Sequence, residues 1–282
     1  MTPRAPHRIA RVRPLSAAAA DEHYFVANDA PDFASRAGRS WTVVDSPFGT
    51  SRANANSPAR TGWEAGDAVE QDSFTFLAPS VPVNVLGMAH NTGQPGRDLP
   101  PQAFHKAASS VIGPGEAIEL SSTVGYVDPE AELTIVVGRT VRGLTLDTAR
   151  DAVLGFTIGN DVSARDLQKS DELWISAKSQ DTFTPVGPWI VTGLDDSSLA
   201  IGIVHNGTEL KPASSADLGW KVDEILVYLT SFMTLHAGDL VLTGFPAECA
   251  RIRPGDTVVC RVEGIGELSN PVEAASWEEA RP

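Results

Sequence analysis

The chain has 282 residues, of which 42% are hydrophobic and 21% are charged, and its formal net charge at pH 7 is -14. This composition is typical of a globular protein that is long enough for one large domain or two unequal ones. The acidic balance argues against nucleic acid and anionic membranes as partners, and no apolar run approaches the length of a membrane span. Cys249 and Cys260 have neither zinc-type spacing nor the number needed for a disulfide framework. We therefore expect a cytoplasmic protein.

Residues 1–78 are expected to form a small β-rich domain. Short apolar pieces, separated by polar residues and by Gly, Pro and Asp, lie at residues 9–12, 24–26 and 41–44. Residues 46–72 are rich in turn formers and poor in large apolar side chains, so we predict a mobile loop there. Apolar density rises from Phe74 onwards, and we place a second domain at residues 79–282.

Strands are expected to dominate the second domain. Strand-like apolar runs lie at residues 133–137, 189–191, 201–204, 240–242 and 257–262. Apolar residues also recur at helical spacing over residues 146–156, behind a capping Thr145, which predicts a helix that ends before Gly159. A second helix is predicted over residues 217–235, and residues 205–207 (HNG) predict a hairpin turn.

Two carboxylates open the most informative strand of the chain. Side chains two residues apart on a strand share a face, so Glu130 and Glu132 stand side by side. Like charges this close repel unless a proton or a cation lies between them. An exposed strand edge would explain this pair by itself, but Asp161 adds a third carboxylate and Lys178 a cation. Oxygen ligands without a histidine or cysteine cluster favour Mg²⁺, Mn²⁺ or Ca²⁺ over Zn²⁺.

Five segments, in this order, resemble the fumarylacetoacetate hydrolase family. They read FHKAASSVIG (104–113), VDPEAEL (127–133), NDVSARDLQ (160–168), KSQDTFTPVGPW (178–189) and LHAGDLVLTGFP (235–246). Ordered motifs over so long a span are more specific than any one of them. The resemblance implies a β-rich α+β fold, a mixed β-sandwich roll with few helices, and also a divalent-metal site and a homodimer. It implies chemistry on small 2-oxo acids and 1,3-dicarbonyls.

The resemblance also implies roles for individual residues. Glu130, Glu132 and Asp161 match the family's metal ligands, and would leave about half of an octahedral Mg²⁺ or Mn²⁺ shell open, with Ca²⁺ as an alternative ion. Lys178 matches a catalytic lysine beside the metal, and Thr182 a residue just outside the ligands. Substrate-binding positions are matched by Lys106, Arg165, Gln168 and Thr243.

Several of these assignments have alternatives. Lys106 also fits a solvated surface lysine, and Arg165 fits a structural partner of Asp166. Thr243 lies in the family's Thr-Gly-Thr-Pro turn, where Phe245 replaces the second threonine. That replacement favours a more apolar pocket.

The segment before Lys106 departs from the family pattern. Hydrolytic members commonly carry Asn-Tyr-x-x-His-x-x-Glu there, in which the carboxylate orients a histidine that activates water. Here His90 is followed three residues later by Gly93, and Asp98 is the only acid before Glu116. His90 is therefore a candidate base or a structural histidine. His105 alternates with Lys106 on a predicted strand and should point away from the site.

Three hypotheses about function follow. The first is a metal-dependent hydrolase that cleaves a C–C bond in an acylpyruvate-like or 1,3-dicarbonyl substrate through a stabilised enolate. The second is a decarboxylase, or an isomerase or tautomerase, that acts on a 2-oxo acid in the same site and needs no activated water. The third is a ligand-binding member without turnover. The missing His-x-x-Glu pair counts against hydrolysis and leaves enolate chemistry intact.

Overall fold

The computed structural model describes residues 7–15, 23–29, 39–49, 55–56, 62–92, 100–245, 247 and 249–275. Within these ranges strands predominate, and the α-helices are α1 (Arg165–Ser170), α2 (Ile175–Lys178) and α3 (Val222–Phe232). Short 3-10 helices are η4 (Gln71–Ser73), η6 (Ala108–Ser110), η7 (Arg150–Ala152) and η8 (Ser215–Asp217). The β-rich fold with few helices that the sequence predicts is confirmed.

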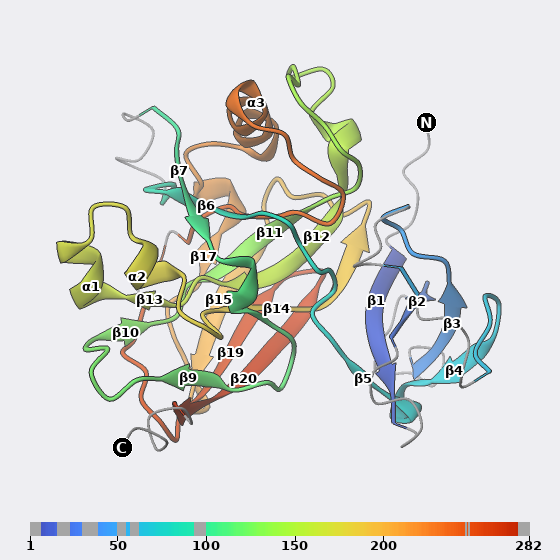
Figure 1. Cartoon of the computed structure of the whole chain (residues 1–282), viewed down its shortest axis with the longest axis horizontal. Helices are drawn as coiled ribbons and strands as arrows, with labels where there is room; N and C mark the ends of the chain where they lie inside the picture. Colours follow the sequence, from blue (N-terminus) through green and yellow to red (C-terminus); the bar gives the residue numbers. More distant parts are fainter. Residues whose placement is uncertain are drawn as a thin grey trace.

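A mixed sheet of twelve strands runs through most of the described chain (Figure 1). Its hydrogen-bonded path is β4 (Ala68–Glu70), β3 (Ser40–Val44), β2 (Tyr24–Asn28), β1 (His7–Pro14), β14 (Thr184–Thr192), β12 (Val153–Asn160), β11 (Ala131–Val137), β18 (Leu240–Leu242), β6 (Val85–Ala89) and β7 (Gln102–Lys106). Off this path, β5 (Phe74–Phe76) pairs with β1 and β8 (Val111–Ile112) with β14. Most neighbours are antiparallel, whereas β18 and β6 are parallel.

A second sheet packs against the middle of the first. It contains β16 (Thr208–Glu209), β15 (Ala200–His205), β19 (Thr257–Val262), β20 (Gly266–Ala274) and β9 (Ile118–Leu120), with β17 (Ala213–Ser214) paired to β15. Contacts join β11, β12 and β14 to its strands, and buried side chains such as Ile135, Phe156, Ile203 and Leu268 fill the core. Each such side chain stabilises the fold by about 1.5–3 kcal/mol. The large sheet and the second sheet thus pack face to face as a β-sandwich.

The helix predicted over residues 146–156 is wrong. That segment forms turns, η7 and then β12, which lies between β11 and β14 in the centre of the large sheet. A central strand is buried on both faces, so its sequence is mostly apolar and lacks the alternation of a half-exposed strand. Gly155 and Gly159 also fit this packing, because a Cβ atom at either position would overlap the neighbouring strand.

The other predicted elements are largely present. The apolar runs predicted as strands lie within β11, β14, β15, β18 and β19. The predicted helix over residues 217–235 is shorter than expected, because η8 precedes it and α3 begins at Val222. Asn206 and Gly207 have φ values of 49° and 78° between β15 and β16, as a two-residue hairpin turn requires.

The N-terminal strands form a lobe to one side of the molecule in Figure 1, yet they continue the large sheet. Ile9 of β1 pairs with Ile190 of β14. Within the segment predicted as a mobile loop, residues 68–70 form β4, so that part of the prediction is wrong. Residues 50–54 and 57–61 lie outside the described residues, and the domain boundary near residue 78 stays a prediction.

Neither cysteine forms a disulfide: Cys249 and Cys260 are both free thiols. None of the helices in the described part of the chain has the length and apolar character needed to cross a membrane.

Candidate metal centre and its cavity

Three carboxylates converge where β11 and β12 meet. Glu130 comes just before β11, Glu132 lies within it, and Asp161 directly follows β12 rather than the helix that the sequence predicts. Strand pairing places Ala131 opposite Asn160, and the Asp161 N–H donates to the Glu130 carbonyl over 2.9 Å. Ligand oxygens of the three side chains all lie within 4.8 Å of one another. Sheet register therefore assembles a group of residues far apart in the sequence.

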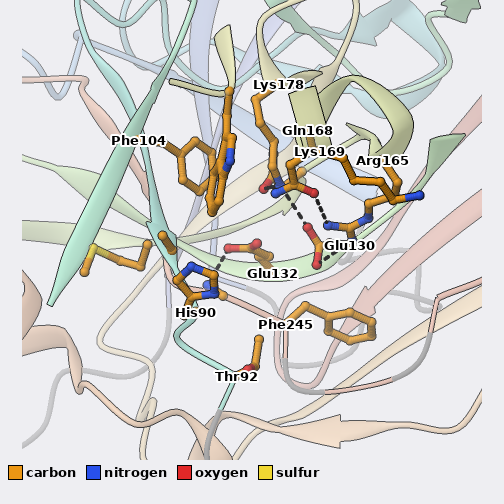
Figure 2. Close-up of a pocket in the computed structure, with 15 residues that line it drawn as sticks. His90, Thr92, Phe104, Glu130, Glu132, Arg165, Gln168, Lys169, Lys178 and Phe245 are labelled. Carbon is orange, nitrogen blue, oxygen red and sulfur yellow. Dashed lines mark hydrogen bonds and ion pairs between the residues drawn. The ribbon is translucent and has the colours of Figure 1, made fainter. Parts of the chain in front are cut away.

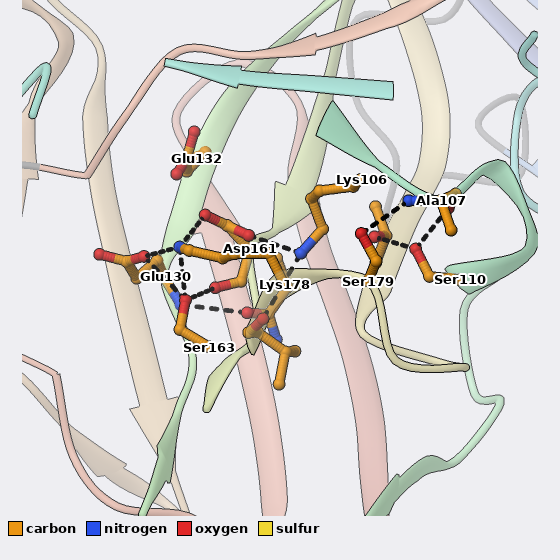
Figure 3. Close-up of polar contacts among 12 residues, drawn as sticks. Lys106, Ala107, Ser110, Glu130, Glu132, Asp161, Ser163, Lys178 and Ser179 are labelled. Carbon is orange, nitrogen blue, oxygen red and sulfur yellow. Dashed lines mark hydrogen bonds and ion pairs between the residues drawn. The ribbon is translucent and has the colours of Figure 1, made fainter. Parts of the chain in front are cut away.

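Two buried lysines hold this group of carboxylates (Figure 3). Lys178 Nζ donates to Glu130 Oε2 at 3.0 Å, to Ser163 Oγ at 2.6 Å and to Asp161 Oδ2. Lys106 Nζ donates to Asp161 Oδ1 at 2.6 Å. All three protons of the Lys178 ammonium have acceptors, so its orientation is fixed.

Lys106 lies behind Asp161 and not at the cavity surface. Its side chain is fully buried, so the alternative of a solvated surface lysine is wrong. Its ammonium contacts Asp161 and not the space above the carboxylates, where a substrate carboxylate was expected. His105, the residue before it, is exposed, in agreement with the predicted alternation along β7.

Burial and charge act against each other in this cluster. Burial raises the pKa of Asp161, but Lys106 and Lys178 outweigh it and hold that pKa below its usual value. Burial lowers the pKa of Lys178, but Asp161 and Glu130 outweigh it and raise that pKa. Glu132 has less compensation: burial and then repulsion from Asp161 and Glu130 raise its pKa well above the ordinary value. Added positive charge would therefore stabilise the ionised carboxylate of Glu132 most.

The three carboxylates provide oxygen ligands that fit a hard divalent cation. Glu132 Oε2 accepts the Gly244 N–H at 2.5 Å, and in the described residues its other oxygen receives no hydrogen bond. Three convergent carboxylates with two of them buried are the oxygen ligands that Mg²⁺, Mn²⁺ and Ca²⁺ prefer. Ser163, which sequence reasoning missed, follows Asp161 by two residues. Its hydroxyl accepts a hydrogen bond from Lys178 and so helps to hold that lysine beside the carboxylates.

Arg165, the first residue of α1, joins the cluster from the solvent side. Its Nε donates to Asp128 at 2.8 Å, its Nη2 to Glu130 at 3.0 Å and its Nη1 to Gln168 at 3.0 Å. Asp166 instead accepts from the Tyr126 N–H and from Lys169, so the alternative pairing of Arg165 with Asp166 is wrong. Asp128 was missed by sequence reasoning, although it precedes Glu130 by two residues.

A cavity of about 390 Å³ opens above the carboxylates (Figure 2). Its polar lining includes Glu130, Glu132, Asp161, Arg165, Gln168, Lys169 and Lys178, and its apolar lining includes Met88, Phe104, Trp174 and Phe245. Its volume suits a small metabolite. The predicted ligands, the lysine beside them, Arg165 and Gln168 therefore share one cavity.

His90 also lines this cavity, directly after β6. Its backbone is left-handed, with φ of 57°, and its ring lies edge-on to Trp174 with 5.5 Å between centroids. Among the residues with described positions, no carboxylate is hydrogen-bonded to the His90 ring. Asp98, the acid nearest in sequence, lies outside the described residues.

Two predicted threonines lie away from the cavity lining. The Thr243 hydroxyl is buried and donates to the Leu133 carbonyl at 2.7 Å, which places Gly244 and Phe245 at the cavity instead. The Thr182 hydroxyl accepts the Glu119 N–H at 2.8 Å. Both thus secure the backbone near the site.

The family model of the fumarylacetoacetate (FAA) hydrolase C-terminal domain matches residues 80–273. The chain belongs to the fumarylacetoacetate hydrolase family. The match contains every residue of the candidate centre and the strands of the large sheet from β6 onwards, whereas β1 to β5 of that sheet lie before it.

Several known proteins are similar to the chain in sequence or structure. Protein Rv2993c of Mycobacterium tuberculosis is 40% identical, covering 82% of this chain and 86% of that protein. The crystal structure of 2-hydroxyhepta-2,4-diene-1,7-dioate isomerase from Mycobacterium marinum gives a TM-score of 0.82 at 34% identity, covering 95% and 99% of the two chains. Oxaloacetate tautomerase fahd2, mitochondrial, of Xenopus laevis is 35% identical, covering 61% of this chain and 58% of that protein.

Proposed function

We propose that this family member is a divalent-metal-dependent isomerase or tautomerase of a 2-oxo acid. The observation that carries the proposal is the cavity above Glu130, Glu132 and Asp161, which His90 enters without a carboxylate partner in the described residues. An isomerase must stabilise an enolate and move a proton, but it needs no oriented base to activate water. Relatives named as an isomerase and as a tautomerase support this choice.

Glu130, Glu132 and Asp161 would hold the cation, which we expect to be Mg²⁺ or Mn²⁺. When bound, such an ion supplies positive charge beside the substrate oxygens on which negative charge develops. Lys178 adds a second, fixed positive charge. Because Asp161 and Glu130 raise its pKa, Lys178 stays protonated and serves as an electrostatic group rather than as a base.

The charges around the cavity favour an anionic substrate. Asp128, Glu130 and Asp161 pair with the three cations Lys106, Lys178 and Arg165, and Glu132 adds a fourth carboxylate, which leaves one negative charge when all are ionised. Lys169, which also lines the cavity, is paired with Asp166 and does not change this sum. A divalent cation would turn this into one positive charge, which a substrate carboxylate neutralises. Arg165 has five N–H donors, of which three are used by partners among the described residues, so we expect the other two to hold that carboxylate, with Gln168 alongside.

In this proposal His90 moves the proton. A proton passes from C3 of the substrate to an imidazole nitrogen, the bonding electrons form the C2–C3 double bond, and the carbonyl oxygen takes the charge. The proton then returns to oxygen, or to a more distant carbon if the substrate is conjugated. His90 lines the cavity from the end of β6, and Lys178 lines it from α2, so the base and the fixed charge come from separate elements.

Cleavage of a C–C bond by hydrolysis is the second candidate, and the family model that matches residues 80–273 favours it. It uses the same ligands and the same enolate, but it requires a water molecule activated by a general base. Decarboxylation of the same 2-oxo acid is a variant that needs no such water.

One experiment separates these reactions. The protein is incubated with Mg²⁺ and oxaloacetate or another short 2-oxo acid in D₂O, and ¹H NMR follows the C3 protons against an EDTA control. The expected result is Mg²⁺-dependent loss of the C3 signals faster than in the control, with the carbon skeleton intact. Two carboxylic acid products would indicate hydrolysis, and CO₂ with a shorter acid would indicate decarboxylation. No exchange with any 2-oxo acid, while metal binding persists, would overturn the proposal and favour a ligand-binding role.

A further inference from the structure

A second cavity, of about 540 Å³, lies next to the first. Phe104 and Trp174 line both cavities, and their ring centroids are 5.6 Å apart. We call this pair the aromatic wall. It separates the charged cavity over the metal centre from a neighbouring hollow that the proposed chemistry does not use.

The Phe104 half of the wall is fixed from two sides. The Lys178 ammonium lies 4.8 Å from the centre of the Phe104 ring (Figure 2). On the other side, Phe104 of β7 is paired with Gly87 of β6, where a Cβ atom would overlap the ring. The absence of a side chain at residue 87 therefore lets the outer end of the ring lie against β6.

The Trp174 half is fixed by the turn before α2. Trp174 has a left-handed backbone, with φ of 59°, which is uncommon for a bulky residue. The Asp171 carboxylate accepts the Ser176 N–H at 2.7 Å and the Leu173 N–H at 3.1 Å. The Trp174 carbonyl accepts the Lys178 N–H at 2.9 Å. The wall is thus attached to the same short helix that carries Lys178.

The hollow beyond the wall suits an uncharged chain. Leu173 and Ile175 line it and are 82% and 54% exposed, which is unusual for large apolar side chains at adjacent sites. Among its described lining residues none is Lys or Arg, whereas Glu172 is acidic. Among the described residues, a second carboxylate on the substrate would meet neither a lysine nor an arginine there.

We propose that Phe104 and Trp174 determine substrate specificity by limiting the length of the substrate tail. This inference rests on the proposed function, because it assumes that a 2-oxo acid lies over Glu130, Glu132 and Asp161. The wall ends the space available to the tail in the first cavity. Without the Trp174 side chain the two cavities join, and the hollow beyond takes an uncharged alkyl or aryl extension.

The test compares N-methyl oxamate with N-hexyl oxamate, which are unreactive mimics of a short and a long 2-oxo acid. Affinities are measured by calorimetry with Mg²⁺ present for the wild type, Trp174→Ala and Phe245→Leu. Phe245 lines the first cavity but not the second, so it is the matched control. Each methylene buried in the hollow should strengthen binding roughly fourfold. We expect the ratio of hexyl to methyl affinity to rise at least tenfold in Trp174→Ala and to stay unchanged in Phe245→Leu.

A further variant locates the tail. Leu173 lines only the second cavity, so adding Leu173→Ser to Trp174→Ala should reduce the gain for the hexyl compound alone. A general loss of folding or of metal binding changes both affinities together and leaves their ratio unaltered.

The outcomes distinguish the two proposals. If the ratio of hexyl to methyl affinity is unchanged in Trp174→Ala while N-methyl oxamate still binds, the aromatic wall does not limit the length of the tail. The isomerase proposal is unaffected by that result. A raised ratio without C3 exchange of any 2-oxo acid supports the wall as a binding determinant and overturns the isomerase proposal. Failure of both oxamates to bind the wild type with Mg²⁺ overturns both.

Discussion

The floor and the rim of the cavity are built in different ways. On the floor, Glu132 and Asp161 are set by the pairing of two central strands, and buried lysines satisfy Asp161. At the rim, His90 and Trp174 lie on turns at the ends of β6 and before α2, each with a left-handed backbone. A floor built from packed strands is determined by many interactions at once, whereas a rim built on turns depends on few.

We therefore expect the floor to determine binding of the proposed cation, and the rim to determine the reaction and the choice of substrate. Substitutions on the floor should change stability and metal affinity, because they leave a buried charge without its partner. Substitutions at the rim should change turnover or specificity and leave the melting temperature and metal affinity nearly unchanged. Four variants test this division, from the largest expected effect to the smallest.

Glu132→Ala should have the largest effect. It removes one of three proposed ligands from the most enclosed side of the site, so we expect Mg²⁺ affinity to fall at least about 100-fold and Mg²⁺-dependent turnover to vanish. Calorimetric titration with Mg²⁺ measures the affinity, and Glu172→Ala, an exposed acid outside the metal centre, is the control. Unchanged affinity in Glu132→Ala would exclude it as a ligand.

Lys106→Met should destabilise the metal-free protein by about 3–5 kcal/mol, because Asp161 would lose one of its two buried cationic partners. Added Mg²⁺ supplies positive charge at the same carboxylate. We therefore expect Mg²⁺ to raise the melting temperature more in this variant than in the wild type, as thermal unfolding with and without the ion would measure. An equal shift in both proteins would mean that Lys106 and the ion do not act on the same carboxylate.

His90→Ala should lower C3 exchange by at least about 100-fold, which is typical for loss of a general base. Because the ring is exposed at the rim, the melting temperature and Mg²⁺ affinity should stay near those of the wild type. His105→Ala is the matched control, since His105 is exposed on β7 and does not line the first cavity. Equal rates in the two variants would remove His90 from the mechanism.

Much of the floor could be predicted from the sequence, since short apolar runs bounded by turn residues gave the strands β11, β14 and β18. The ligand residues came from their resemblance to a family, and the sheet register explains why they meet. The start of β12 was mistaken for part of a helix because a strand buried on both faces has no alternation, and because Val153 and Phe156 happen to continue a helical spacing from Leu146 and Ala149 in the turns before it.

The rim was harder to predict, for physical reasons. α1 and α2 have six and four residues, which is too short for a helical pattern to appear in the sequence. The left-handed backbone of Trp174 depends on side-chain hydrogen bonds of Asp171 across the turn. The position of Lys106 depends on how β7 packs over Asp161, and neither its residue type nor its spacing indicated full burial.

Gly87→Ala should have the smallest effect and links the two regions, because Gly87 lies in β6 while the ring that it supports belongs to the wall. The added methyl group must displace the Phe104 ring. The ring faces a cavity into which it can shift, so we expect a loss of about 1 kcal/mol in stability, at the low end for overpacking. The shift should also change the hexyl-to-methyl oxamate ratio. Gly202→Ala in β15 is the control, since a Cβ atom there meets nothing within 4 Å. Adding Phe104→Leu, which removes the overlapping ring atoms, should restore most of the stability lost in Gly87→Ala. If it does not, Gly87 does not act through Phe104.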